Sequence, residues 1–407
     1  MYRIAYRESQ SKEKLIFTRN LIAKKDEKMD PRIQKIVIPA ALNALANINN
    51  NDIRKHAAEI LESHKAQPTS MKDGQAYVGY LIARERWDEL IKIGKPALDL
   101  LLKAIEDKSF IRKREIFSTL GAICGSLADQ KIVEQKVIPL LIHEASTNKY
   151  FNTVNPFTVL GIIGASPNCS KDARDIIVNF LKEQSVETKT TGPGMPLTAL
   201  SQIAAALPIT NPLKKRITNI LLESDADVFI ELETIALSLP KNHELRKRII
   251  NKFKNKLTDE NVRQRQKSAE SLGWIGWKPQ TTEDKLTFYY AGEKWDKLIA
   301  MGVESLDFLM QHLVSESGWA DEVVGASIFR IATNIINSEG IELVKTKILE
   351  PIFNLLLQKR ISGGNIFHMA GLLTINLYDG EYTKTRLLPL ILKLDKIDDS
   401  YEDIILF

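Results

Sequence analysis

The sequence has little of what metal sites and disulfide frameworks require. It contains two cysteines, Cys124 and Cys169, and six histidines among 407 residues. Neither a CxxC nor an HExxH spacing occurs, so we expect no disulfide scaffold and no conventional zinc site. Such sparse cysteine is typical of a reducing compartment, and we expect a cytoplasmic protein.

Long apolar runs are also missing. The first residues, "MYRIAYRESQSKEK", carry polar groups where a signal peptide has an apolar run. No run of about 18 uncharged apolar residues occurs, so we expect no membrane span. The charge is nearly balanced, because 56 basic residues against 51 acidic ones give a formal net charge of +5. This balance permits an acidic partner or nucleic acid without requiring either.

The sequence is rich in helical periodicity, and 44% of its residues are hydrophobic. Segments such as Ile111–Cys124, Val137–Ala145 and Leu213–Ser224 place apolar residues at i, i+3, i+4 and i+7. Proline- and glycine-containing breakers separate these segments. The pattern predicts an all-α fold of roughly twenty helices.

One block of sequence occurs twice. "ARERWDELIKIG" (Ala83–Gly94) matches "AGEKWDKLIAMG" (Ala291–Gly302) without a gap. An "AE.L" pattern ending at Leu61 or Leu272 precedes each copy, and "LD.L" follows each. We therefore predict a duplicated block at about 53–125 and 263–316, with more divergent repeats at 126–262.

These motifs resemble the HEAT-like repeats named for phycobilisome lyases. The resemblance rests on "AAEIL" (Ala57–Leu61), "AESLGWIGWKP" (Ala269–Pro279) and the two "W-D-x-L-I-x-x-G" blocks. It implies an α-solenoid, an armadillo-like superhelix of about ten HEAT-like helix pairs, running through residues 1–407 as one continuous domain.

The stretch "LGWIGWKPQ" (Leu272–Gln280) is predicted to be a helix end inside a packed repeat, because Pro279 forbids continuation of the helix. We expect its tryptophans in the core and its glycines where a neighbouring helix approaches closely.

Basic residues cluster near several predicted helix starts, and stacking of equivalent positions would join them into a ridge. Acidic residues at Asp225, Asp227 and Glu231 are expected to interrupt that ridge. The clusters are Arg54-Lys55, Arg112-Lys113-Arg114, Lys214-Lys215-Arg216, Arg246-Lys247-Arg248 and the set Arg263, Arg265 and Lys267. The candidate partner-binding residues are Arg54, Lys55, Arg112, Arg114, Arg263 and Lys267.

Enzymatic alternatives have less support in the residues. Phycobilin lyase activity is implied by the resemblance alone, and no residue is assigned to it. The pairs His143-Glu144 and His243-Glu244 resemble the iron-binding pairs of HEAT-repeat deoxyhypusine hydroxylases, but that family has four pairs in matched repeats. A HEAT-like DNA glycosylase needs an aromatic cleft with a catalytic carboxylate.

The favoured hypothesis is a non-catalytic, cytoplasmic protein-binding scaffold without a cofactor. A phycobilin-lyase-like enzyme subunit, or nucleic-acid binding through the basic ridge, is the alternative.

Overall fold

The computed structural model describes residues 31–47, 50–107, 113–128, 130–147, 155–187, 194–315, 319–338, 340–358, 380–387 and 389. Within these ranges the chain forms helices joined by short connections, and no residue lies in a β-strand. The all-α prediction is confirmed for this part of the chain. None of the described helices is long and apolar enough to cross a membrane.

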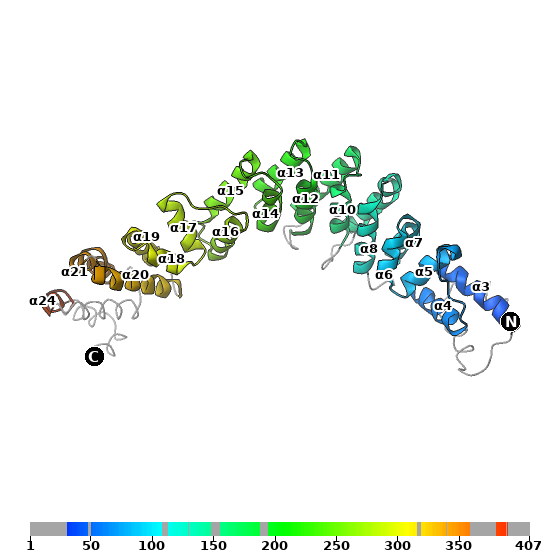
Figure 1. The fold of residues 1–407 in the computed structure, drawn as a ribbon, viewed down its shortest axis with the longest axis horizontal. Coiled ribbons are helices and arrows are strands. Elements are labelled where there is room, and N and C mark those ends of the chain that lie inside the picture. The colour runs from blue at the N-terminus through cyan, green and yellow to red at the C-terminus, as the bar shows by residue number, and fades with distance from the viewer. Residues whose placement is uncertain are drawn as a thin grey trace. The chain divides into compact units, whose positions relative to one another are not determined.

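The chain divides into two compact units, Met1–Ile249 and Ile250–Phe407, and the boundary falls inside α15. Figure 1 shows the described helices of each unit. Those that begin in the first unit are α3 (Pro31–Asn47), α4 (Asn51–Ser63), η1 (Met71–Asp73), α5 (Gln75–Ala83), α6 (Trp87–Ile93), η2 (Lys95–Ala97), α7 (Leu98–Glu106), α8 (Lys113–Ser126), η3 (Val133–Val137), α9 (Ile138–Thr147), α10 (Pro156–Ala165), α11 (Lys171–Glu187), α12 (Gly194–Ala206), α13 (Pro212–Glu223), α14 (Phe229–Leu237) and α15 (Glu244–Lys256).

Each helix of the first unit packs mainly on helices close to it in sequence. The helix α12 contacts α10 and α14 on either side and also α11 and α13. Figure 1 shows α10, α12 and α14 in one layer and α11 and α13 in the other. Because α12 is in contact on several sides, its sequence is apolar nearly all round and lacks charged residues.

Two glycines allow close helix contacts in this unit. A Cβ atom at Gly79 of α5 would overlap the backbone of Leu45 in α3. A Cβ atom at Gly161 of α10 would lie 3.0 Å from the Cα atom of Ala199 in α12. Glycine at these positions therefore allows one helix to approach the backbone of another.

The second unit contains the remaining helices around a core of aliphatic residues. Among the core residues are Leu298, Leu309, Ile328, Ile331 and Val344. The helices are α16 (Val262–Trp274), α17 (Thr282–Ala291), α18 (Trp295–Ala300), α19 (Val303–Ser315), α20 (Trp319–Ser338), α21 (Ile341–Val344), η4 (Lys345–Leu349), α22 (Glu350–Leu357), α24 (Gly380–Tyr382) and η5 (Thr383–Leu387).

The predicted helix end in "LGWIGWKPQ" is confirmed, since α16 ends at Trp274. Gly276 has a φ of 72°, and the amide of Trp277 donates to the Leu272 carbonyl over 2.9 Å. This is the Schellman arrangement, in which a residue with positive φ turns the chain back onto the last helical carbonyls.

The expectation that the tryptophans lie in the core is wrong for Trp274, and the expectation of a close helix contact is wrong for Gly273. Trp277 packs on Phe288, with ring centroids 5.4 Å apart, but Trp274 is 75% exposed. Trp274 lies two residues after the buried Leu272, so helical periodicity turns it toward a different face. A Cβ atom at Gly273 would have no atom within 4 Å, so this glycine does not admit a neighbouring helix.

Candidate interaction surface

The basic cluster at the start of α13 is divided between interior and surface. Lys214 is 1% exposed, and its ammonium donates to the carbonyl oxygens of Leu207 (3.1 Å) and Ala205 (3.4 Å). These carbonyls lie at the C-terminal end of α12, where a helix leaves its last carbonyl groups without intrahelical partners. Burial lowers the pKa of Lys214. This lysine therefore ties α13 to α12 and is not a surface group.

Arginines of α11 and α15, which like α13 are the second helices of their pairs, make the same kind of contact with the preceding helix. Arg174 of α11 donates to the carbonyl oxygens of Gly164 (2.8 Å) and Ser166 (2.9 Å) at the end of α10. Arg246 of α15 donates to the Leu239 carbonyl over 2.7 Å, just after α14. A cation at a helix C-terminus also interacts favourably with the helix dipole. In these three helix pairs, a basic side chain near the start of the second helix therefore binds carbonyl groups at the end of the first.

Arginines two positions further along the chain link the second helix of one pair to the second helix of the preceding pair. Arg216 of α13 donates to Asn179 of α11 over 2.5 Å and lies 3.8 Å from the Asp175 carboxylate. Arg248 of α15 donates to Asn219 of α13 over 2.8 Å. Repetition of this arginine-to-asparagine bond aligns α11, α13 and the first part of α15.

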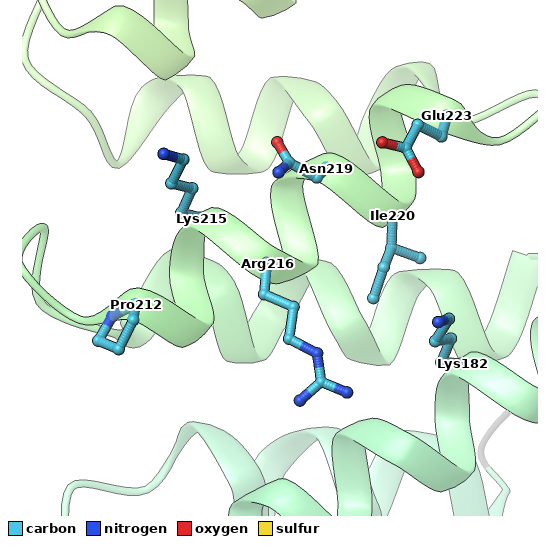
Figure 2. Close-up of a pocket in the computed structure, with 7 residues that line it drawn as sticks. All are labelled: Lys182, Pro212, Lys215, Arg216, Asn219, Ile220 and Glu223. Carbon is cyan, nitrogen blue, oxygen red and sulfur yellow. The ribbon is translucent and has the colours of Figure 1, made fainter.

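An opening of about 340 Å³ lies between α11 and α13. Figure 2 shows Lys182, from α11, extending toward Ile220 on the α13 side of this opening. The lining residues are Lys182, Pro212, Lys215, Arg216, Asn219, Ile220 and Glu223. Three basic side chains and one carboxylate thus line the opening, together with the apolar residues Pro212 and Ile220.

The charges at this opening are exposed. Lys182, Lys215 and Arg216 are each in contact with solvent, as is Glu223 at the other end of α13. Arg216 is held by its contacts with α11, whereas the two lysine ammonium groups make no ion pair with any described residue. The opening therefore presents positive charge from two different helices.

Fewer acidic residues are exposed beside the basic clusters than the sequence predicted. Glu231 of α14 is buried, and its carboxylate accepts a hydrogen bond from Thr198 Oγ1 of α12 over 2.7 Å. Its expected place on the ridge is therefore wrong, because it faces the neighbouring helix. Asp225 and Asp227 are exposed, as predicted.

Of the candidate residues in the first unit, Arg54 does not fit its predicted role. It is 0% exposed in α4, so a partner at the surface has no access to it. Lys55 is half-buried and forms an ion pair of 3.3 Å with Glu85. Arg114 is exposed on α8, and Arg112 lies outside the described residues.

The other two candidates lie on α16 in the second unit. Arg263 is exposed and Lys267 is half-buried. Between them, Arg265 is buried and donates to the carbonyl oxygens of Asp259 (3.0 Å) and Glu260 (3.2 Å). The cluster is thus split between interior and surface, as at α13.

The described part of the chain includes the His-Glu pairs and the cysteines that were considered for metal binding or catalysis. No three of its His, Cys, Asp and Glu side chains are placed to hold a metal ion. Glu144 is buried and lies 3.7 Å from Lys113, and His243 accepts a hydrogen bond from the Leu245 amide at the start of α15. Burial raises the pKa of the Cys124 thiol to about 12, which leaves it protonated at neutral pH.

The sequence revealed the basic cluster of α13 but not its partner across the opening. Lys182 lies in the fourth turn of α11, away from any cluster, and only packing of α11 beside α13 brings it to the opening that Lys215 and Arg216 line. Asn179, one helical turn before Lys182, binds Arg216 and so lies on the same side of α11.

Comparisons of the chain with protein-family models, curated proteins and solved structures found no match.

Proposed function

We propose that this protein is a non-catalytic protein-binding scaffold whose helix pairs form a HEAT-like α-solenoid. Two features support the solenoid. Helices α10 to α14 contact mainly their near neighbours in sequence, and a basic residue near the start of α11, α13 and α15 binds the end of the preceding helix. A stacked array of this kind offers one face of successive helices as a continuous binding surface.

The opening between α11 and α13 is the docking site for an acidic segment of a partner protein. The observation that carries this proposal is that Lys182, Lys215 and Arg216 line one opening of about 340 Å³ in which Glu223 is the one acidic lining residue. Charge complementarity at a partly open site favours association and fixes orientation. The Arg216–Asn179 bond holds one cation in place before the partner arrives, which lowers the entropy lost on binding.

A protein segment suits this site better than nucleic acid. Binding of single-stranded nucleic acid depends on aromatic side chains that stack on bases, and no aromatic residue lines this opening. The binding of nucleic acid also requires many phosphate contacts, whereas one of the three cations here is engaged with Asp175 and Asn179.

The test uses a fluorescein-labelled peptide of ten glutamates and the full chain. Lys182→Glu/Lys215→Glu is expected to weaken peptide binding, measured by fluorescence anisotropy, by about tenfold or more. The matched control Lys241→Glu/Lys278→Glu changes the net charge equally at exposed lysines outside the opening and should have little effect.

Equal losses in both double variants would show that net charge alone attracts the peptide, and would refute the docking site. Single-stranded DNA that binds more tightly than the peptide, with a steep salt dependence, would favour the nucleic-acid alternative. A bound chromophore that absorbs visible light in protein purified from its native source would favour a lyase-type subunit.

A further inference from the structure

The two matched sequence blocks have the same turn before the tryptophan, in which the amide of Arg86 or Lys294 donates to the carbonyl five residues earlier. Glu85 and Glu293 occupy the same place in the two "W-D" motifs, and both have positive φ, 57° and 52°. Each accepts a hydrogen bond from the first helix of its block, Glu85 from Lys55 and Glu293 from Gln266. The first block therefore serves as an internal reference for the second.

The blocks differ at one contact between their first two helices. In the first block, Arg84 binds the Glu62 carboxylate through two nitrogens, at 2.8 and 2.5 Å, and Tyr80 donates to the same carboxylate over 2.7 Å. In the second block, Gly292 stands where Arg84 does, and Gly273 stands where Glu62 does. Both partners of the ion pair have thus been replaced by residues without side chains.

An opening of about 290 Å³ lies where the ion pair would be. Gly292 lies against the small Ala269 at its base, and Trp274 stands beside it, 75% exposed. The residue of the first block that corresponds to Trp274 is Ser63. The lining residues are Ala269, Glu270, Gly273, Trp274, Gly292 and Lys294. Loss of two charged side chains has therefore been accompanied by gain of a large exposed indole.

We propose that this opening is an anchor pocket for an acidic segment of a partner protein, and that Trp274 covers one apolar side chain of that segment. The inference rests on the proposed protein-binding function but uses a different site. The volume suits one large side chain. Interfaces derive most of their affinity from such anchors, which Trp residues often contact. The bare backbone at Gly273 allows the segment to approach α16 closely.

The charge of the occupant follows from the outer face of α16. Arg263, Lys267, Glu270 and Trp274 succeed one another at spacings of four, three and four residues, so they follow one side of the helix. Lys294 adds a further positive charge at the pocket, so three basic residues accompany one acidic residue. An acidic segment along α16 would meet Arg263 and Lys267 while its apolar side chain enters the pocket.

The first block indicates which substitutions should fill the pocket of the second block. Gly273→Glu/Gly292→Arg would restore the Glu62–Arg84 pair of the first block. The backbone permits this change, because Gly292 (φ −91°, ψ 10°) has nearly the conformation of Arg84 (φ −97°, ψ 5°). Trp274→Ser likewise introduces the residue of the first block. Ile230→Ser removes an exposed apolar side chain elsewhere and is the matched control.

The probes are two fluorescein-labelled peptides of acidic residues, one with a central phenylalanine and one with alanine in its place. The wild-type chain should bind the phenylalanine peptide about tenfold more tightly. Both Trp274→Ser and Gly273→Glu/Gly292→Arg should abolish this preference, whereas Ile230→Ser should retain it. Arg263→Glu should weaken binding of both peptides equally. Circular dichroism checks that each variant is folded. If the double variant is not folded, Trp274→Ser alone tests the proposal.

Equal affinity for the two peptides in the wild type, or a preference that survives closure of the pocket, would overturn the inference. The two proposals fail separately. Lys182→Glu/Lys215→Glu should leave the phenylalanine preference unchanged, because those lysines lie at the other site. If binding of the glutamate peptide depends on those lysines while the phenylalanine and alanine peptides bind with equal affinity, the first proposal stands and the second is refuted.

Discussion

The ammonium group of Lys214 lies 2.9 Å from the hydroxyl oxygen of Ser238. Ser238 caps the C-terminal end of α14, and the same ammonium also binds Leu207 at the end of α12. One side chain of α13 therefore holds the ends of two adjacent helices in the other layer. Such a link would matter in the solenoid that we propose, because each helix pair of a solenoid contacts only its neighbours.

Replacement of Lys214 by methionine should destabilise the protein at neutral pH. The Lys214→Met side chain leaves the buried carbonyl of Leu207 without its donor, which costs about 1–3 kcal/mol. Lys215→Met, at the exposed neighbouring position, should change the free energy of unfolding by less than about 0.5 kcal/mol. Urea unfolding followed by circular dichroism measures both, and equal effects would contradict an internal role for Lys214.

The deficit of Lys214→Met should also widen as the pH rises toward 10.5, the ordinary pKa of lysine. Burial lowers the pKa of Lys214 in the folded state, so the unfolded chain binds more protons between the two pKa values. The stability of the wild type therefore rises with pH in that window, and the variant lacks this gain. A constant difference between pH 8 and pH 10 would contradict the buried charge.

A buried charge in α4 gives a second prediction. None of the three guanidinium nitrogens of Arg54 has a hydrogen-bond partner among the described residues. Burial lowers the pKa of Arg54 to about 10, although the nearby Asp107 opposes the shift. Asp107→Asn keeps an oxygen to accept from the Asn51 amide but removes the compensating charge. We expect a loss of about 3–5 kcal/mol, the usual effect of leaving a buried charge uncompensated.

The double variant Arg54→Met/Asp107→Asn should recover most of that loss, because neither partner then carries a buried charge. The measurement is a double-mutant cycle of unfolding free energies. Additive effects of the two substitutions would show that Arg54 and Asp107 do not interact.

Local pattern was enough to predict the helices but not the burial of individual charged residues. The periodicity of Leu213–Ser224 correctly predicted α13, and Pro279 correctly marked the end region of α16. The sequence placed Lys214 and Arg54 on a surface ridge because basic residues are seldom buried. Their burial depends on carbonyl and carboxylate groups of other helices, which helical periodicity does not describe.

The candidate sites were predictable only in part, for the same reason. Arg263 and Lys267 were identified from the sequence, and they lie on the helix that carries Trp274. Trp274 itself was assigned to the core, because exposed tryptophan is uncommon and its neighbours are apolar. The two blocks carry a further sequence signal that the prediction did not use, because Gly273 and Gly292 stand where the first block has the Glu62–Arg84 pair.

Two glycines in helices should respond oppositely to alanine. In Gly79→Ala the new Cβ atom would overlap the Leu45 backbone, so α3 and α5 must move apart, and we expect a loss of about 1–3 kcal/mol or more. Gly273→Ala meets no atom within 4 Å, and the helix propensity of alanine should stabilise α16 by about 0.5–1 kcal/mol.

Amide hydrogen exchange gives this pair of variants a spatial readout. In a stacked array a local perturbation weakens adjacent elements first, because stability is nearly a sum of neighbouring interactions. Gly79→Ala should therefore lower protection in α3, α4 and α5, which contact one another, and leave α12 to α14 close to the wild type. Uniform loss of protection across α3 to α14 would instead indicate one cooperative domain, and would count against the solenoid as well as against a local role for Gly79.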